Sequence, residues 1–290
     1  MKRLIIFIFL FISAFSGFAQ EEETEVTPIR NDWGSTQLID NQTTFNPDAK
    51  KLELIIQHRF GEFENGLTDL FGIYAPSNIR MGFNYGITDD IMVAVGTEKN
   101  NKMQDIQVKW TPLRQTNTNS IPVTVSAFGI MGIDAREEAV FGTEYAFTNR
   151  LSYFGQVIVS KNFNERISVM LAPSFSHFNV VDSLYDHDRI GLTFGTRVKI
   201  VGKLFATLEY DHPFYFDSMK EFIRTDEQND KINSKPNLAF GIEKNSRTHS
   251  FQIFLATCDK ITPQKNFHYN LKDIAEGDFI LGFNICVKFK

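Results

Sequence analysis

The chain has 290 residues, a formal net charge of −5, 29 phenylalanines and a mean hydropathy of −0.20. A hydrophobic fraction of 42% excludes a disordered chain, and 18 Gly, 9 Pro and 2 Cys exclude collagen-like and disulfide-dense proteins. The slightly hydrophilic average opposes a helical membrane protein, which needs apolar runs of roughly 20 residues. The acidic balance also argues against nucleic acid as a partner, because phosphate binding needs clustered Lys and Arg.

Residues 1–19 have the pattern of a secretory signal peptide. The start is basic, residues 4–15 are almost purely apolar, and Gly17 and Ala19 stand at the −3 and −1 positions of a cleavage site. Cleavage after Ala19 would leave 28 basic and 35 acidic residues, a charge of −7. An uncleaved membrane anchor is the alternative. No cysteine lies near the site, so a lipid anchor is not expected.

Residues 20–50 are polar and acidic at the front, with Pro28 and Pro47. We expect a flexible periplasmic leader here, with a short ordered piece around residues 33–39. Such a leader could engage a periplasmic protein.

From Lys51 onward the sequence alternates apolar and polar residues with a period of two, which is typical of β-strands with two different faces. No later segment shows a helical period longer than a loop insert. About twelve strands are predicted, over residues 51–60, 78–87, 91–95, 105–110, 123–127, 153–160, 167–171, 190–200, 204–211, 238–243, 250–255 and 279–289. Pro173 cannot donate a ladder hydrogen bond, so a bulge or an early strand end is expected there.

The connections between these strands alternate in length. Short connections are expected at 88–90, 111–120, 161–165, 201–203 and 244–247, and long ones at 61–76, 133–150, 176–188, 215–236 and 258–277; the short segment 99–102 is the exception. This is the layout of a bacterial outer-membrane barrel with periplasmic turns and extracellular loops. An even number of strands would put both termini on the periplasmic side.

A soluble β-sandwich also alternates, but three features favour a closed transmembrane barrel. Bulky aromatics stand near strand ends, as in the aromatic girdles of membrane barrels, at Phe60, Tyr85, Trp110, Tyr210, Phe279 and Phe289. The opposite strand faces carry charge and glycine, which a packed core would not tolerate. Twelve strands must also close, because lipid allows no open sheet edge.

The last strand ends on an aromatic residue, which looks like the signal that the outer-membrane assembly machinery reads. Phe289 is penultimate here, a small departure from a terminal aromatic. Cys258 and Cys286 fall near opposite ends of neighbouring strands, too far apart for a disulfide, and are predicted to be free thiols.

Three segments resemble an outer-membrane β-barrel family of Bacteroidota whose function is unassigned. They are residues 57–61 (QHRFG), 74–80 (YAPSNIR) and 85–90 (YGITDD). The resemblance would cover residues from about 35 to the end. It implies a membrane barrel and brings no catalytic residues.

The polar residues that share the inward parity are the candidate functional residues. They are Glu53, Gln57, Arg59, Arg80, Asn84, Lys109, Arg197, Glu209 and Glu243. Arg59 and Arg80 would lie near the same end of adjacent strands, where a basic patch in a narrow pore would favour anionic solutes. Salt-bridged filler in a closed lumen is the alternative, since a barrel of this size suits either.

A second hypothesis makes the protein a lipid-ester hydrolase similar to outer-membrane phospholipase. His58 and Ser77 share the outward parity on adjacent strands and could act as base and nucleophile. That family's own motifs are absent, and Asn78 has the wrong parity to orient His58.

The remaining loops carry weaker signals. Residues 186–188 (DHD) and 211–212 (DH) offer metal-type ligands without a pattern that brings them together, so no metal is predicted. Residues 66–72 (GLTDLFG) could fold into the barrel mouth as a plug or lid. No phosphate-binding or dinucleotide-binding glycine pattern is present, and no cofactor is expected.

The sequence therefore predicts a barrel in the outer membrane of a Gram-negative bacterium. It would pass or bind a small solute, or serve as a filled structural or partner-docking barrel. Its expected partners are outer-membrane lipid, the barrel assembly machinery, a small solute and a periplasmic protein.

Overall fold

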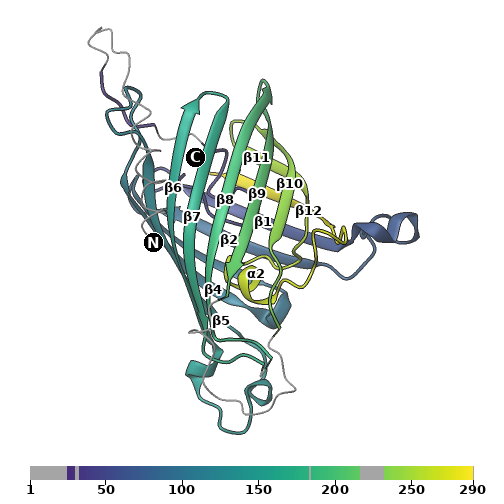
Figure 1. Cartoon of the computed structure of the whole chain (residues 1–290). Helices are drawn as coiled ribbons and strands as arrows, with labels where there is room; N and C mark the ends of the chain where they lie inside the picture. The colour runs from purple at the N-terminus through teal and green to yellow at the C-terminus, as the bar shows by residue number, and fades with distance from the viewer. Residues whose placement is uncertain (1–24, 30–32, 183, 216–231, 290) are drawn as a thin grey trace, which may run out of the picture.

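The computed structural model describes residues 25–29, 33–182, 184–215 and 232–289, and its fold is a closed antiparallel barrel (Figure 1). Each strand pairs with its neighbours in the chain, and the first pairs with the last. The described residues form twelve strands: β1 (Leu52–Glu62), β2 (Asn78–Gly86), β3 (Ile91–Glu98), β4 (Gln104–Leu113), β5 (Thr124–Ile133), β6 (Leu151–Asn164), β7 (Ile167–Phe178), β8 (Asp188–Val201), β9 (Leu204–Phe214), β10 (Asn237–Asn245), β11 (His249–Ala256) and β12 (Ile280–Lys288). The predicted fold class is confirmed. The predicted signal peptide lies outside the described residues.

The connections alternate in length, as expected, and so define two ends of the barrel. Turns such as 165–166 and 202–203 mark the short-loop end, and segments such as 134–150 and 257–279 mark the long-loop end. The start of β1 and the end of β12 pair at the short-loop end, where Leu54 faces Val287.

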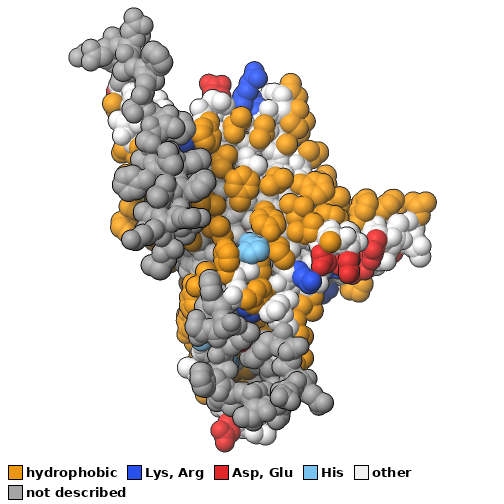
Figure 2. Space-filling view, in the orientation of Figure 1, with side chains coloured by type: hydrophobic (Ala, Val, Ile, Leu, Met, Phe, Trp, Pro, Cys, Tyr) orange, Lys and Arg blue, Asp and Glu red, His pale blue; other side chains and the backbone are white. Residues whose placement is uncertain are grey.

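The two faces of each strand differ in polarity, and this places the barrel in lipid. Along β2 the outward side chains Met81, Phe83 and Tyr85 are exposed, whereas the inward Arg80 and Asn84 are buried. Figure 2 shows hydrophobic side chains covering the barrel wall on the face in view, with charged side chains gathered at its ends and on a projecting loop. The outward face therefore suits a hydrocarbon solvent, and the inward face does not.

Pro173 neither ends its strand nor shifts its register, so the expectation of a bulge or strand end was wrong. β7 continues to Phe178, and the pairs Gln156–Ser174 and Val159–Leu171 on either side of Pro173 keep one register. Next to Pro173 the β6–β7 ladder is interrupted at two positions, Ala172 and Pro173, and the exposed ring of Pro173 lies on the outward face. The missing N–H of Pro173 therefore interrupts the pairing locally and does not end β7.

The expected periplasmic leader is where the structure differs most from the sequence prediction. Residues 33–47, which we call the plug, lie inside the barrel, and the side chains along the whole segment are buried. A barrel of this size is wider than its own wall side chains can fill, so an inserted segment can occupy the lumen. Of the described leader, residues 25–29 and 48–50 are not part of the buried plug, and Ile29 pairs with Gln115 of the β4–β5 connection.

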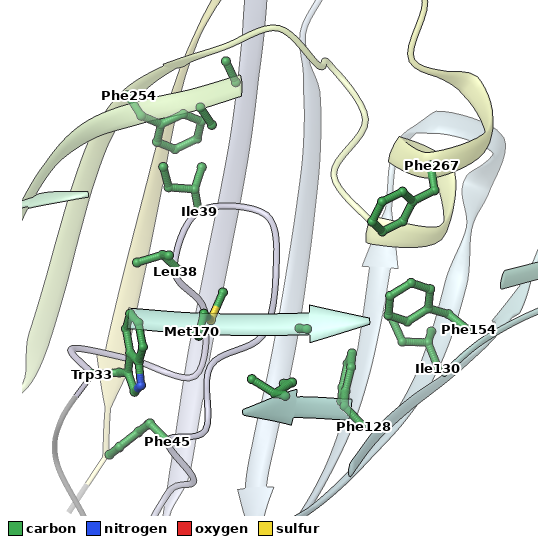
Figure 3. Packing of buried hydrophobic residues seen from close by; sticks show 14 of the residues in the cluster. Trp33, Leu38, Ile39, Phe45, Phe128, Ile130, Phe154, Met170, Phe254 and Phe267 are labelled. Carbon is green, nitrogen blue, oxygen red and sulfur yellow. The ribbon is translucent and has the colours of Figure 1, made fainter. Parts of the chain in front are cut away.

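Apolar residues of the plug form the core of the molecule (Figure 3). Trp33, Leu38, Ile39 and Phe45 pack in one cluster with apolar wall residues, among them Met170 and Phe254. The wall is shaped for the plug, because a Cβ atom on Gly195 would lie 2.7 Å from Cδ2 of Leu38. A side chain at position 195 would therefore displace Leu38 or Met170 where the plug contacts β8.

Two further expectations concern the chain as a whole. Cys258 and Cys286 are both buried and free, so the prediction of free thiols is confirmed. Within the described residues, no helix is long and apolar enough to cross a bilayer.

The two tryptophans provide a test of this architecture. Trp33 is 2% exposed inside the barrel, whereas Trp110 is 54% exposed on the outward face of β4. In liposomes of lipids with brominated acyl chains, the fluorescence of the Trp33→Phe variant, which reports Trp110, should be strongly quenched. The Trp110→Phe variant reports Trp33 and should be quenched little. Equal quenching of the two would contradict a plug inside the lumen.

Candidate functional site

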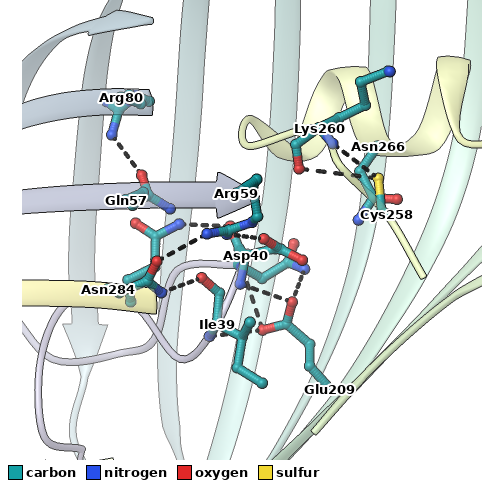
Figure 4. Close-up of polar contacts among 12 residues, drawn as sticks. Ile39, Asp40, Gln57, Arg59, Arg80, Glu209, Cys258, Lys260, Asn266 and Asn284 are labelled. Atoms are coloured by element: carbon teal, nitrogen blue, oxygen red, sulfur yellow. Dashed lines mark hydrogen bonds and ion pairs between the residues drawn. The ribbon is translucent and has the colours of Figure 1, made fainter. Parts of the chain in front are cut away.

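The first anchor of the plug is a carboxyl group on β9. Glu209 accepts hydrogen bonds from three consecutive backbone N–H groups, those of Ile39 at 3.2 Å, Asp40 at 3.0 Å and Asn41 at 3.2 Å. The Asn41 side chain adds a fourth bond at 2.9 Å. Figure 4 shows Glu209 beside Ile39 and Asp40 of the plug. Glu209 is fully buried, so these donors satisfy carboxyl oxygens that would be costly to leave without partners inside the barrel.

Two more acidic groups surround Glu209 and complete this anchor. Oxygens of Asp40, Glu209 and Asp211 lie within 4.8 Å of one another, a spacing that could hold a cation. Their oxygens already accept hydrogen bonds from the plug and the wall. Asp40 forms a buried ion pair with Arg59, and the other donors to Asp40 and Asp211 are Asn41, Thr193, Asn237 and Asn266. The cluster therefore joins the plug to the wall.

Lys109 on β4 makes the second anchor, to carbonyl groups of the plug. Its Nζ donates to the backbone oxygens of Thr43 at 2.9 Å and Phe45 at 2.6 Å, and to the Gln42 side chain at 2.9 Å. Glu209 and Lys109 thus bind the N–H and C=O groups of one irregular segment, which has no regular secondary structure to satisfy them.

A third anchor lies on β1 and β2. Thr36 of the plug donates to Glu53 at 2.6 Å, and Asn84 donates to both Thr36 at 2.8 Å and Glu53 at 3.1 Å. Cys286 of β12 donates its thiol to the same carboxylate at 2.8 Å. A buried charge is again surrounded by donors from the plug and the wall.

All nine candidates of inward parity are buried side chains of the barrel interior: Glu53, Gln57, Arg59, Arg80, Asn84, Lys109, Arg197, Glu209 and Glu243. Of the two alternatives for Arg59 and Arg80, the geometry agrees with salt-bridged filler and not with an unpaired basic patch. Arg80 pairs with Asp105 at 2.7 Å, just as Arg59 pairs with Asp40. Each guanidinium is compensated because an unpaired charge would be unfavourable in so enclosed a site.

A short helix closes the lumen from the long-loop end. Helix α2 (Pro263–Tyr269) belongs to the β11–β12 connection and is buried except at its last residue. Its Lys265 pairs with Glu98 at 3.2 Å, and its Asn266 donates to Asp211 at 2.9 Å. A Cβ atom on Gly191 would lie 2.3 Å from the Phe267 ring, so the wall is shaped for this helix too.

Residues 66–72, which we expected in the barrel mouth, lie elsewhere. The segment includes the end of the 3-10 helix Phe63–Thr68, which projects sideways from the barrel wall (Figure 1). Leu67 is 81% exposed, and Phe71 stacks on Phe63 within the projection. Helix α2 occupies the mouth instead.

The hydrolase hypothesis finds no support in the geometry. The His58 ring stacks on Phe283 at 5.0 Å and contacts Phe60, and the described residues show no hydrogen bond from it to Ser77. The structure does contain a different Ser–His pair, since Nε2 of His268 lies 2.7 Å from Oγ of Ser176. Both are fully buried, and burial with the nearby Arg189 charge lowers the His268 pKa to about 3. An inaccessible histidine of this pKa is a poor general base.

The two metal-type ligands at residues 211–212 point to opposite sides of the barrel wall. Asp211 points into the lumen from β9, whereas His212 lies against Tyr210 and Phe214 on the outward side. Within the described residues, the group Asp40, Glu209 and Asp211 is the one place where three such ligands converge.

Comparison with known proteins supplies a family and a fold. A family model described as "Membrane bound beta barrel domain (DUF5777)" matches residues 33–289. The matched region begins at the first residue of the plug. No curated protein matches the chain.

Among solved structures, the barrel is similar to the NanC porin (11% identity, 82% of this chain and 99% of that chain, TM-score 0.48). It is also similar to the KdgM porin, with 7% identity, 82% of this chain and 99% of that chain covered, and a TM-score of 0.48. An outer-membrane channel from Pseudomonas putida F1 matches with 11% identity, 84% of this chain and 96% of that chain covered, and a TM-score of 0.49. Likeness at this level says nothing about what this chain binds.

The Glu209 anchor can be tested by hydrogen exchange. Replacing Glu209 by Ala leaves three buried N–H groups of the plug without an acceptor, at about 1–3 kcal/mol each. We expect exchange of the amides of residues 39–41 to speed up by roughly tenfold or more. Glu98→Ala is a matched control, because Glu98 is equally buried and contacts helix α2. Unchanged exchange in Glu209→Ala would contradict the anchor.

Proposed function

We infer that this chain, which belongs to the DUF5777 family of membrane-bound β-barrel domains, is an outer-membrane barrel closed by its own N-terminal segment. A small solute passes when the plug moves. We assign the barrel no catalytic step. The short-loop end faces the periplasm in this proposal, as expected for an exported chain with an even number of strands.

The observation that carries the proposal is the polarity of the contact between plug and wall. Glu209, Lys109 and Glu53 hold the plug through hydrogen bonds, and apolar contacts come from a few residues such as Trp33 and Leu38. Exchanging such a bond for water costs only about 0.5–1.5 kcal/mol net. Polar wall groups such as Glu209 and Lys109 tolerate hydration, so withdrawal of the plug would leave a passage with solvated polar groups, although apolar wall residues such as Met170 and Phe254 would lose their contacts with the plug.

A second candidate, the filled partner-docking barrel, is favoured by a different observation. Residues 25–29 lie along the β4–β5 connection, where Ile29 donates to Gln115 at 2.8 Å and Asn117 donates to Thr27 at 3.0 Å. The chain entering the plug is therefore presented at the short-loop end. A periplasmic protein that binds residues 20–50 would reach the plug from this side.

Planar-bilayer recordings distinguish the two candidates. Wild-type barrels should show rare steps or none, whereas a variant with residues 35–45 replaced by a Gly-Ser linker should conduct steadily. Replacing residues 263–269 as well should raise the conductance further, because helix α2 fills the other end.

Heat-modifiable gel migration provides the control that each variant folds into a barrel. A folded barrel that stays silent after both replacements would contradict the gated channel and favour the filled barrel.

A further inference from the structure

A cavity of about 800 Å³ opens at the short-loop end, on the outer side of the plug. The β6–β7, β8–β9 and β10–β11 turns and the paired ends of β1 and β12 form its walls, and Trp33, Phe45 and Phe205 contribute apolar surface. We call this cavity the vestibule. Its volume is in the range of small-molecule sites.

The vestibule is strongly basic although the whole chain carries a net charge of −5. Of its described lining side chains, seven are Lys or Arg, and three are the acids Asp48, Glu53 and Glu165. Glu53 already binds the plug through Thr36. Positive charge is thus concentrated at one mouth of an acidic protein, which raises the local concentration of anions there.

Among the described residues, most of these cations have no acidic partner. Arg197 pairs with Glu243 at 2.8 Å, and Lys288 donates to the Gly34 carbonyl at 2.6 Å. The other five have no ion pair within the described residues: Lys51, Arg166, Lys199, Lys203 and Arg247. Unlike Arg59 and Arg80, they were not neutralised when the barrel folded.

We propose that the vestibule binds a small organic anion through its phosphate or carboxylate groups. Lys199 reaches in from the wall of β8 and Arg247 from the β10–β11 turn, so the anion would be held from two sides. Guanidinium and ammonium groups are the usual protein ligands of such anions. The apolar surface of Trp33 and Phe45 would lie against the uncharged body of the solute.

This inference rests on the proposed function and names the solute class of the same passage. Lys288 connects the two, because its ammonium group binds the plug at Gly34, lies 4.7 Å from the Phe45 ring and also lines the vestibule. An anion there would compete with the plug for this charge.

Calorimetric titration tests the proposal on the refolded full chain in an uncharged detergent. Glucose 6-phosphate is the probe, and glucose is its uncharged control. We expect saturable binding of the phosphate alone, weakened by about tenfold in the double variant Lys199→Gln/Arg247→Gln and by added salt. Lys244→Gln is the matched charge control. Lys244 lies next to the vestibule on β10, but it is exposed and does not line the cavity.

Two outcomes would overturn the proposal. One is absence of saturable binding, or equal weakening in Lys244→Gln, which would indicate bulk charge alone. The other is preference for the headgroup of dihexanoyl-phosphatidylglycerol over glucose 6-phosphate, which would make the vestibule a lipid contact. Binding needs no movement of the plug, so failure here leaves the conductance test of the gated channel intact. Failure of that test likewise leaves the anion site standing.

Discussion

The buried acidic and basic side chains inside this barrel need partners, and much of the rest of the structure follows from that constraint. Lipid requires that the apolar side chains face outward, which leaves Glu53, Lys109 and Glu209 pointing into the lumen. Their charges are too far from bulk water to remain unpaired. The plug supplies what they need, because an irregular backbone offers both free N–H and free C=O groups. Wall and plug therefore satisfy each other.

The alternating pattern made the barrel predictable. Strand periodicity is a local property of the sequence. Because side chains alternate between the two faces of a strand, a residue's position in the alternation decides whether it faces lipid or the lumen, independently of distant parts of the chain. This is why the strand order, the alternating loops and the burial of residues such as Arg80 and Arg197 agree with the sequence. It also explains how 29 phenylalanines fit a chain of slightly negative mean hydropathy, since polar inward residues offset apolar outward ones.

The contents of the lumen were not predictable in the same way. Ile39 meets Glu209 across 170 positions of sequence, and Arg59 finds its partner Asp40 in a segment that reads as a polar leader. Helix α2 lies in a connection with no convincing helical period. The one local signal was the presence of Trp33, Leu38, Ile39 and Phe45 in that leader, which disordered segments seldom carry. Partners this distant are fixed by the closed fold and not by local pattern.

The two ends of the lumen then have different characters. At the long-loop end, helix α2 is packed against the wall and its Lys265 is neutralised by Glu98. At the short-loop end, the plug lies beneath the basic vestibule. A solute entering from that side would meet unpaired charge first and the plug second. This order of contacts is what a gated passage for anions requires.

Disulfide trapping in the membrane tests the central claim, the position of the plug, most directly. Oγ1 of Thr44 lies 2.7 Å from Oγ of Ser160 on β6, so Thr44→Cys/Ser160→Cys should cross-link when both native cysteines are replaced by serine. Thr44→Cys/Ser176→Cys should not, because Ser176 lies near the long-loop end of β7. Near-complete linkage of the first pair in isolated membranes, measured by mass spectrometry of joined peptides, is the predicted result. No linkage of 44 to 160 in a folded barrel would contradict the account.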